Sequence, residues 1–99
     1  MLRFVSLTQA NNNKHKYKIT LENLTTKRIH KIKFGAYGYD DYTKSQNDNK
    51  KKNYLLRHQV REDWTDPLKA GTLSRFILWN KPTVESSLKD YIKRFSIIK

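Results

Sequence analysis

Apolar and polar residues alternate through the first third of the chain. In residues 15–22, and again in residues 28–34, apolar side chains occupy nearly every second position. A period of two residues predicts β-strands with one buried face, and the turn-rich link at residues 23–26 predicts that these strands form a hairpin. Residues 2–8 predict a third strand, separated from the hairpin by an asparagine-rich turn at residues 11–13. The side chains predicted to face the core are Tyr17, Ile19, Leu21, Ile32 and Phe34.

The second half of the chain has the spacing of helices. A helix is predicted over residues 48–61, and a second should start at Asp66 and Pro67, as N-cap and first helical residue, and run to about Trp79. A third helix should be capped by Thr83. The side chains predicted to face inward are Tyr54, Leu55 and His58 in the first helix, Leu68, Ala70, Leu73, Phe76 and Ile77 in the second, and Leu88, Tyr91, Ile92 and Phe95 in the third.

Strands followed by helices predict an α+β fold in which two or three helices pack on one face of a three-stranded antiparallel meander. We interpret residues 1–99 as a single domain, because domains of about 50 to 250 residues are usual. Its parts are a β-meander over residues 1–34, a Tyr- and Gly-rich crossing loop over residues 35–47, and a helical part over residues 48–99. The loop should wrap over an edge of the core.

Composition narrows the class of protein. Only 36% of the 99 residues are hydrophobic and none is cysteine, so the core is small, disulfides are excluded, and a reducing, intracellular compartment is expected. The sequence has no apolar run of the roughly 20 residues that cross a bilayer, and its first residues do not form a secretory signal. We therefore expect neither a membrane protein nor a secreted one.

Charge is the strongest functional signal in the sequence. Twenty-one Lys and Arg face nine Asp and Glu, a net charge of +12. Residues 1–34 carry a net +7, residues 35–66 balance to zero, and residues 67–99 carry +5. A charge of about 2–8 is enough for the solubility of a small domain, so this excess predicts a polyanionic partner, nucleic acid first.

The alternation places a group of basic side chains on the exposed face of the predicted hairpin, and the last helix offers a second group. Lysine outnumbers arginine 15 to six, which favours phosphate contact over the reading of bases; the alternative is a compositional bias of an AT-rich genome. Tyrosines beside the hairpin are candidates for base stacking, with burial over the small core as the alternative. The predicted nucleic-acid-binding residues are Lys16, Lys18, Lys31, Lys33, Lys89, Lys93 and Arg94, and the stacking candidates are Tyr37 and Tyr39.

Acidic residues gather in the middle third of the chain, near His58. Convergent carboxylates could serve a metal-dependent nuclease, yet no metal-ligand spacing and no set of acid, base and nucleophile is recognisable. We expect no enzyme, no cofactor and no metal site. His58 is interpreted as a packed, hydrogen-bonded residue, and Glu62 and Asp63 as ion-pair partners of Arg61 or a nearby lysine.

Several short motifs are familiar as a set. They are Phe34-Gly35, Gly38-Tyr39, Asp41-Tyr42-Thr43, Arg57-His58, Arg61-Glu62, Trp64, Ala70-Gly71, Ser74, the block Leu78-Trp79-Asn80-Lys81-Pro82-Thr83, Asp90 and Arg94-Phe95. With these motifs the sequence resembles a family of short uncharacterised proteins of giant and other large DNA viruses of protists and algae, over about two-thirds of the chain.

The resemblance implies a viral protein from an AT-rich genome. Together with the charge, it leads us to expect a non-enzymatic, polyanion-binding accessory protein, packaged in the virion or located in the cytoplasm or nucleus of the infected cell. The alternative is a minor structural protein of the virion, or of a ribonucleoprotein assembly, that contacts acidic protein surfaces. The oligomeric state stays open.

Overall fold

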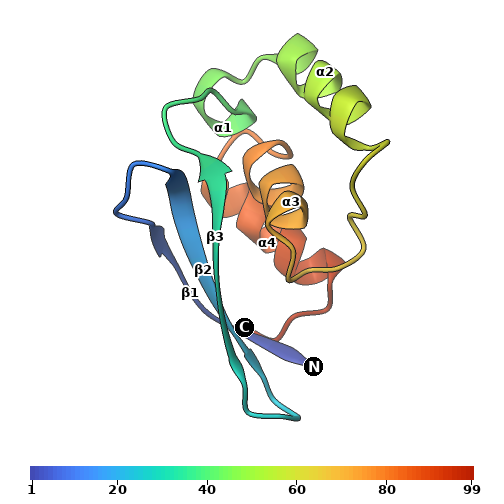
Figure 1. The fold of residues 1–99 in the computed structure, drawn as a ribbon. Helices are drawn as coiled ribbons and strands as arrows, with labels where there is room; N and C mark the ends of the chain where they lie inside the picture. The colour runs from blue at the N-terminus through green and yellow to red at the C-terminus, as the bar shows by residue number, and fades with distance from the viewer.

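The first part of the chain folds into a three-stranded antiparallel sheet. The computed structural model describes residues 1–99, and its strands are β1 (Leu2–Gln9), β2 (His15–Asn23) and β3 (Ile29–Ala36). They lie side by side in the order β1-β2-β3 (Figure 1). The meander predicted from the alternation is therefore confirmed.

Asparagine side chains organise both turns of the sheet. Asn12 Oδ1 accepts the backbone N–H groups of Lys14 and His15 before β2, and Asn23 Oδ1 accepts those of Thr25 and Thr26 after it. Such local bonds satisfy the backbone in place of the sheet ladder, which is why Asn is common in turns.

The helices follow the sheet in sequence. They are α1 (Tyr42–Ser45), α2 (Asp48–His58), α3 (Ala70–Leu73), a π-helical segment continuous with α3 (Ser74–Leu78), and α4 (Val84–Arg94). In Figure 1, α3 and α4 lie against one side of the sheet, whereas α2 stands apart near one end of it. This arrangement is the predicted α+β class. No helix is long and apolar enough to span a lipid bilayer.

One apolar cluster joins the sheet to the helices. Half-buried side chains pack around it, among them Tyr17 and Ile32 of the sheet and Leu88, Ile92 and Phe95 in and after α4. The inward faces predicted for the hairpin and for the last helix are thus confirmed. The buried members of the cluster are Ile19, Leu21, Phe34, Leu73, Phe76, Ile77, Leu78, Tyr91 and Ile97.

The second helix starts later than predicted. Asp66 caps a turn, accepting the backbone N–H of Leu68 at 2.9 Å, and α3 begins only at Ala70, with Lys69 as N-cap. An Asp-Pro pair suits a tight turn as well as a helix start, and tertiary packing selects the turn. After α3 the hydrogen bonds lengthen by one residue, with the Trp79 N–H donating to the Ser74 carbonyl at 3.1 Å.

Candidate functional site

Three lysines lie on the sheet face that points away from the helices. Lys18 is directly opposite Lys33 across β2 and β3, and Lys31 is opposite Thr20. Lys31 and Lys33 are exposed and Lys18 is half-buried. None of the three forms an ion pair. We call Lys18, Lys31 and Lys33 the lysine row. Directly opposed like charges on a sheet repel one another, so this row is a preformed positive surface without an internal counter-ion.

Lys16 does not belong to this free surface, contrary to the prediction. Its Nζ donates to the Asp41 carboxylate, and the two side chains are only 11% and 2% exposed. Asp41 also accepts the backbone N–H of Thr43 at 2.8 Å, as the N-cap of α1. Strand alternation places Lys16 correctly on the polar face, but it could not show that a carboxylate 25 residues later covers it.

The basic residues predicted on the last helix lie in a different region. Lys89 and Lys93 are exposed, while Arg94 is held by Asp90 at 3.2 Å and stacks over the Phe76 ring at 4.5 Å. Because α4 packs on the π-helical segment, which itself contacts β3, these residues lie on a different surface from the lysine row. The structure therefore divides the predicted binding residues between two surfaces.

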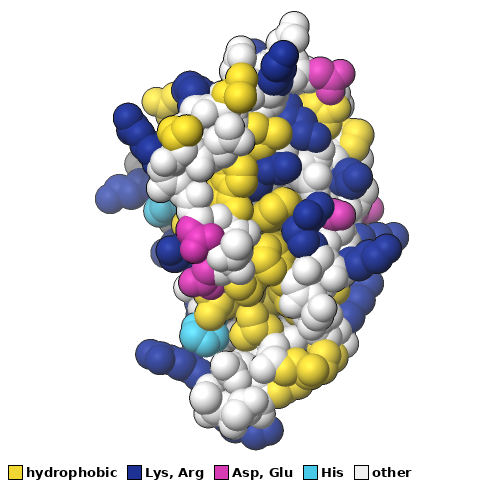
Figure 2. Space-filling view, turned by 90° about the vertical axis from the view of Figure 1, so that its right-hand side faces the viewer, with side chains coloured by type: hydrophobic (Ala, Val, Ile, Leu, Met, Phe, Trp, Pro, Cys, Tyr) yellow, Lys and Arg dark blue, Asp and Glu magenta, His cyan; other side chains and the backbone are white.

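Internal ion pairs engage few of the basic side chains. Only four of the 21 Lys and Arg side chains pair with carboxylates, namely Arg3, Lys16, Lys50 and Arg94. Figure 2 views the molecule from the right-hand side of Figure 1 and shows Lys and Arg around a strip of hydrophobic side chains, with few acids between them. Positive charge is thus available on the helical side too.

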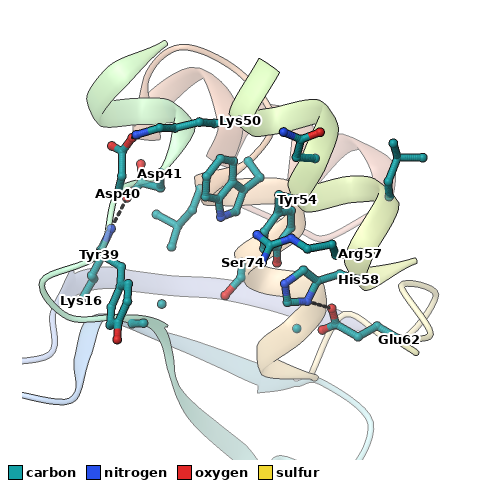
Figure 3. A pocket seen from close by; sticks show the side chains of 17 residues that line it. Lys16, Tyr39, Asp40, Asp41, Lys50, Tyr54, Arg57, His58, Glu62 and Ser74 are labelled. Carbon is teal, nitrogen blue, oxygen red and sulfur yellow. Dashed lines mark hydrogen bonds and ion pairs between the residues drawn. The ribbon is translucent and has the colours of Figure 1, made fainter. Parts of the chain in front are cut away.

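A cleft that the sequence did not predict lies where the sheet meets α2. It has a volume of about 870 Å³, and its walls come from α2, the α3–π segment, the loop after β3, and the ends of β2 and β3 (Figure 3). Three cations and three carboxylates line it, so its formal charge is zero with His58 neutral. These are Lys16, Lys50, Arg57, Asp40, Asp41 and Glu62.

Gly35 sets the shape of the cleft at the sheet. It lies opposite Lys16, between the paired residues Tyr17–Phe34 and His15–Ala36, and has a φ of +79°. A Cβ at this position would come within 2.6 Å of Leu78 Cδ1. Only glycine permits both this backbone conformation and this close approach.

A stack of three rings forms the α2 wall of the cleft. Tyr54 lies between His58, at 4.1 Å between ring centroids, and Trp79, at 4.6 Å. Burial, with the Glu62 carboxylate as a smaller cause, raises the pKa of Tyr54 above its usual range. His58 Nδ1 is 2.6 Å from Glu62 Oε2. The interpretation of His58 as packed and hydrogen-bonded is confirmed.

The predicted partners of the two neighbouring acids are wrong. Glu62 pairs with His58 rather than with Arg61 or a lysine, and Asp63 accepts hydrogen bonds from Thr65. Both acids bind residues two to four positions away, because the chain turns just after α2. Asp40 instead pairs with Lys50 at 2.9 Å, and this hydrogen bond lowers the pKa of Asp40 despite some desolvation.

The two predicted stacking tyrosines are free of the core. Tyr37 is 59% exposed and Tyr39 is 71% exposed, so the alternative that they cover the core does not hold. Tyr39 stands on the rim of the cleft, across from α2 (Figure 3). Tyr37 lines a second groove, of about 700 Å³, next to the β1–β2 turn.

Lysines at the start of α2 serve to hold that helix in place. Lys51 Nζ donates to the Asn80 carbonyl at 2.7 Å, and burial, with Arg75 and Lys81 nearby, lowers the pKa of Lys51.

As for metals, no group of three or more His, Cys, Asp or Glu side chains is arranged to hold an ion.

Comparison with known proteins identifies a family without a known activity. The family model described as "Family of unknown function (DUF5754)" matches residues 5–58, which include most of β1, all of β2 and β3, the loop after them and α2. No curated protein matches the chain, and no solved structure does. Neither the nucleic-acid role nor the viral origin is tested by these results, and both stay predictions.

Proposed function

The chain belongs to the DUF5754 family of unknown function, and from its charged surfaces we propose that it is a non-enzymatic protein that binds the phosphate backbone of nucleic acid with little sequence specificity. The observation that carries the proposal is the lysine row. Three cationic side chains gather on one face of β2 and β3, with no carboxylate paired to any of them.

Repulsion within the row favours an anionic partner. Lys18 and Lys33 are direct cross-strand neighbours, and side chains at such positions have Cβ atoms about 4.5–5.5 Å apart. Phosphates that bind there relieve the repulsion and release the counter-ions condensed on the nucleic acid. Lysine contacts phosphate as a point charge without reading base edges, which supports the low sequence specificity.

The exposed cations of α4 provide a second contact region. Lys89 and Lys93 have no carboxylate partner, and they lie on a different surface from the lysine row. Two positive surfaces allow one molecule to contact two segments of nucleic acid. We place the primary contact on the sheet because two of its lysines, Lys18 and Lys33, are directly opposed.

The viral setting implied by the sequence resemblance forms part of this proposal, as does an accessory role in the virion or the infected cell. An acidic virion protein is the alternative partner for the same positive surface. The two partners differ in a measurable way: nucleic acid of any sequence should bind with an affinity that grows with length, whereas a protein partner should form a complex of fixed stoichiometry.

The test is the triple variant Lys18→Gln, Lys31→Gln, Lys33→Gln. Binding to single-stranded and double-stranded oligonucleotides should weaken for all sequences alike. The slope of log affinity against log salt should fall by about 0.7 to 0.9 for each lysine removed. Affinity is measured by fluorescence anisotropy over a series of salt concentrations, and circular dichroism checks that the variant folds.

A control with the same change in net charge is Lys52→Gln, Lys69→Gln, Lys99→Gln, at exposed positions away from the row. It should lower the affinity much less than the row variant does. If both triple variants weaken binding equally, net charge alone accounts for the affinity. If the row variant binds as the unchanged protein does, the row is not the contact surface.

A further inference from the structure

We infer that the cleft between α2 and the sheet holds one unpaired base of the bound strand, so that the protein prefers single-stranded to double-stranded nucleic acid. The inference rests on the proposed function, since it assumes that a strand runs along the lysine row. It assigns the cleft a ligand class, a flat heterocycle with exocyclic amino groups, and it assigns Tyr39 the role of the stacking ring.

The cleft lies close to the lysine row along the strands but opens on the helix side of the sheet. Lys16 and Gly35, two residues from Lys18 and Lys33 along β2 and β3, line it, and its other walls come from α2 and the α3–π segment. Residues two apart on a strand are separated by about 7 Å. A nucleic-acid strand whose phosphates lie on the row therefore reaches the cleft by passing round the ends of β2 and β3.

The charges of the cleft suit a base better than a phosphate. Its Lys16 and Lys50 side chains are already paired with Asp41 and Asp40, so a phosphate would meet three carboxylates and a single free cation, Arg57. Base edges carry amino donors, and Asp or Glu oxygens accept from groups such as the cytosine N4 amine. One Glu62 oxygen bonds to His58, and the other lies beside Gly71 without a hydrogen-bond partner.

The shape and the apolar lining also fit a flat ring. Leu78 and Trp79 contribute apolar surface, and Figure 3 shows the side chains of Tyr54 and His58 on the side of the cleft across from Tyr39. At 71% exposure, the Tyr39 ring is free to close on a base. Unpaired bases are held in this way by aromatic side chains.

A base within a duplex cannot enter, because it is stacked and paired. Taking it out of the stack costs a few kcal/mol, whereas a single strand offers its bases freely. The lysine row alone would contact both kinds of nucleic acid. A preference for single strands therefore distinguishes binding in the cleft from binding on the lysine row.

The experiment compares Tyr39→Ala with Tyr37→Ala. Both rings are exposed, but only Tyr39 lines the cleft. Tyr39→Ala should weaken binding to a single-stranded oligonucleotide of about 12 nucleotides by about 5- to 100-fold, the equivalent of losing one base stack. Binding to a duplex of the same sequence should stay unchanged. Tyr37→Ala, which removes an exposed ring outside the cleft, should lower single-strand affinity much less than Tyr39→Ala does.

A second variant fills the cleft from an exposed position on α2. Asn53→Phe should lower single-strand affinity to the same degree while the circular dichroism spectrum and melting temperature stay near those of the unchanged protein. As a probe without phosphate, cytidine should shift the NMR signal of the Trp79 indole N–H in the cleft and leave that of Trp64 unmoved.

The outcomes separate the two proposals. If Tyr39→Ala and Asn53→Phe bind single strands normally while the lysine-row variant loses affinity, the cleft inference is overturned and the proposed function stands. If no nucleic acid binds at any salt concentration, both are overturned. If duplex binds as tightly as single strand, the preference assigned here is wrong.

Discussion

Helices α2 and α4 have the same length, capping and charge pattern, but they differ in how they are attached to the rest of the protein. Each has 11 residues, a side-chain N-cap (Asn47 or Thr83), one acid in its first turn and basic residues in its last. Yet α4 sets a continuous apolar face against the core, whereas α2 buries only Tyr54. The polar contacts of α2 involve Asp48, Lys50, Lys51 and His58.

The spacing of apolar residues explains the difference. In α4, Leu88, Tyr91 and Ile92 follow the i, i+3, i+4 pattern that brings side chains to one face. In α2 the apolar residues Tyr54, Leu55 and Leu56 are consecutive, so they point in different directions and Leu56 stays 53% exposed. A helix attached by one ring stack and a few polar contacts can form a wall of a cleft without belonging to the main core.

Among substitutions in these two helices, Tyr91→Ala in α4 should cause the largest loss of stability. Tyr91 is fully buried and donates its hydroxyl to the Pro67 carbonyl at 2.8 Å. Tyr91→Ala should lower the free energy of unfolding by about 3–5 kcal/mol, a large share of the roughly 5–15 kcal/mol typical of a domain. Urea denaturation measures it. Phe95→Ala should show the same trend, and an unchanged melting temperature in both variants would contradict the assigned core face.

A smaller and more local effect is expected at Tyr54. Tyr54→Ala removes the ring stack that holds α2, but it leaves the main core intact. We expect a loss of about 1–3 kcal/mol, and hydrogen exchange should accelerate over α2 while α4 stays protected. Equal acceleration in both helices would mean that α2 and α4 unfold as one unit, and would contradict the weaker attachment of α2.

The smallest effect should come from the helix caps. Thr83 Oγ1 accepts the backbone N–H of Ser86 at 3.1 Å, and Asn47 Oδ1 accepts that of Lys50 at 3.0 Å. Thr83→Ala should lower the free energy of global unfolding by about 1 kcal/mol. Asn47→Ala should change global stability less and should mainly raise hydrogen exchange in α2. Equal losses of global stability would show that both helices contribute fully to the cooperative core.

Elements with regular periodicity were predictable from the sequence. The hairpin faces followed from the alternation around Ile19, Leu21 and Phe34, and the α4 face from the spacing of Leu88, Tyr91 and Ile92. In both cases a single period runs through the whole element, so local pattern and final burial agree. The start of α3 was not predictable in this way, because Asp66 and Pro67 suit a turn as well as a helix.

The candidate site was predictable only in part. The lysine row was predictable from the strand period alone. That Lys16 is not part of the free surface depends on its ion pair with Asp41, a contact between the sheet and the loop after it. The cleft depends on several such contacts at once, between residues far apart in the chain. Its only local sign is the glycine at position 35, and a glycine by itself does not reveal what lies against it.

The sequence by itself determined the strands, the apolar face of the last helix, and a net charge that internal pairs cannot cancel. These properties depend on the order of neighbouring residues and on simple counts. Tertiary structure decided which cations are free, where α2 lies, and that a neutral cleft forms at the end of the sheet. Those properties depend on distances between remote residues, and such distances are fixed only when the chain packs.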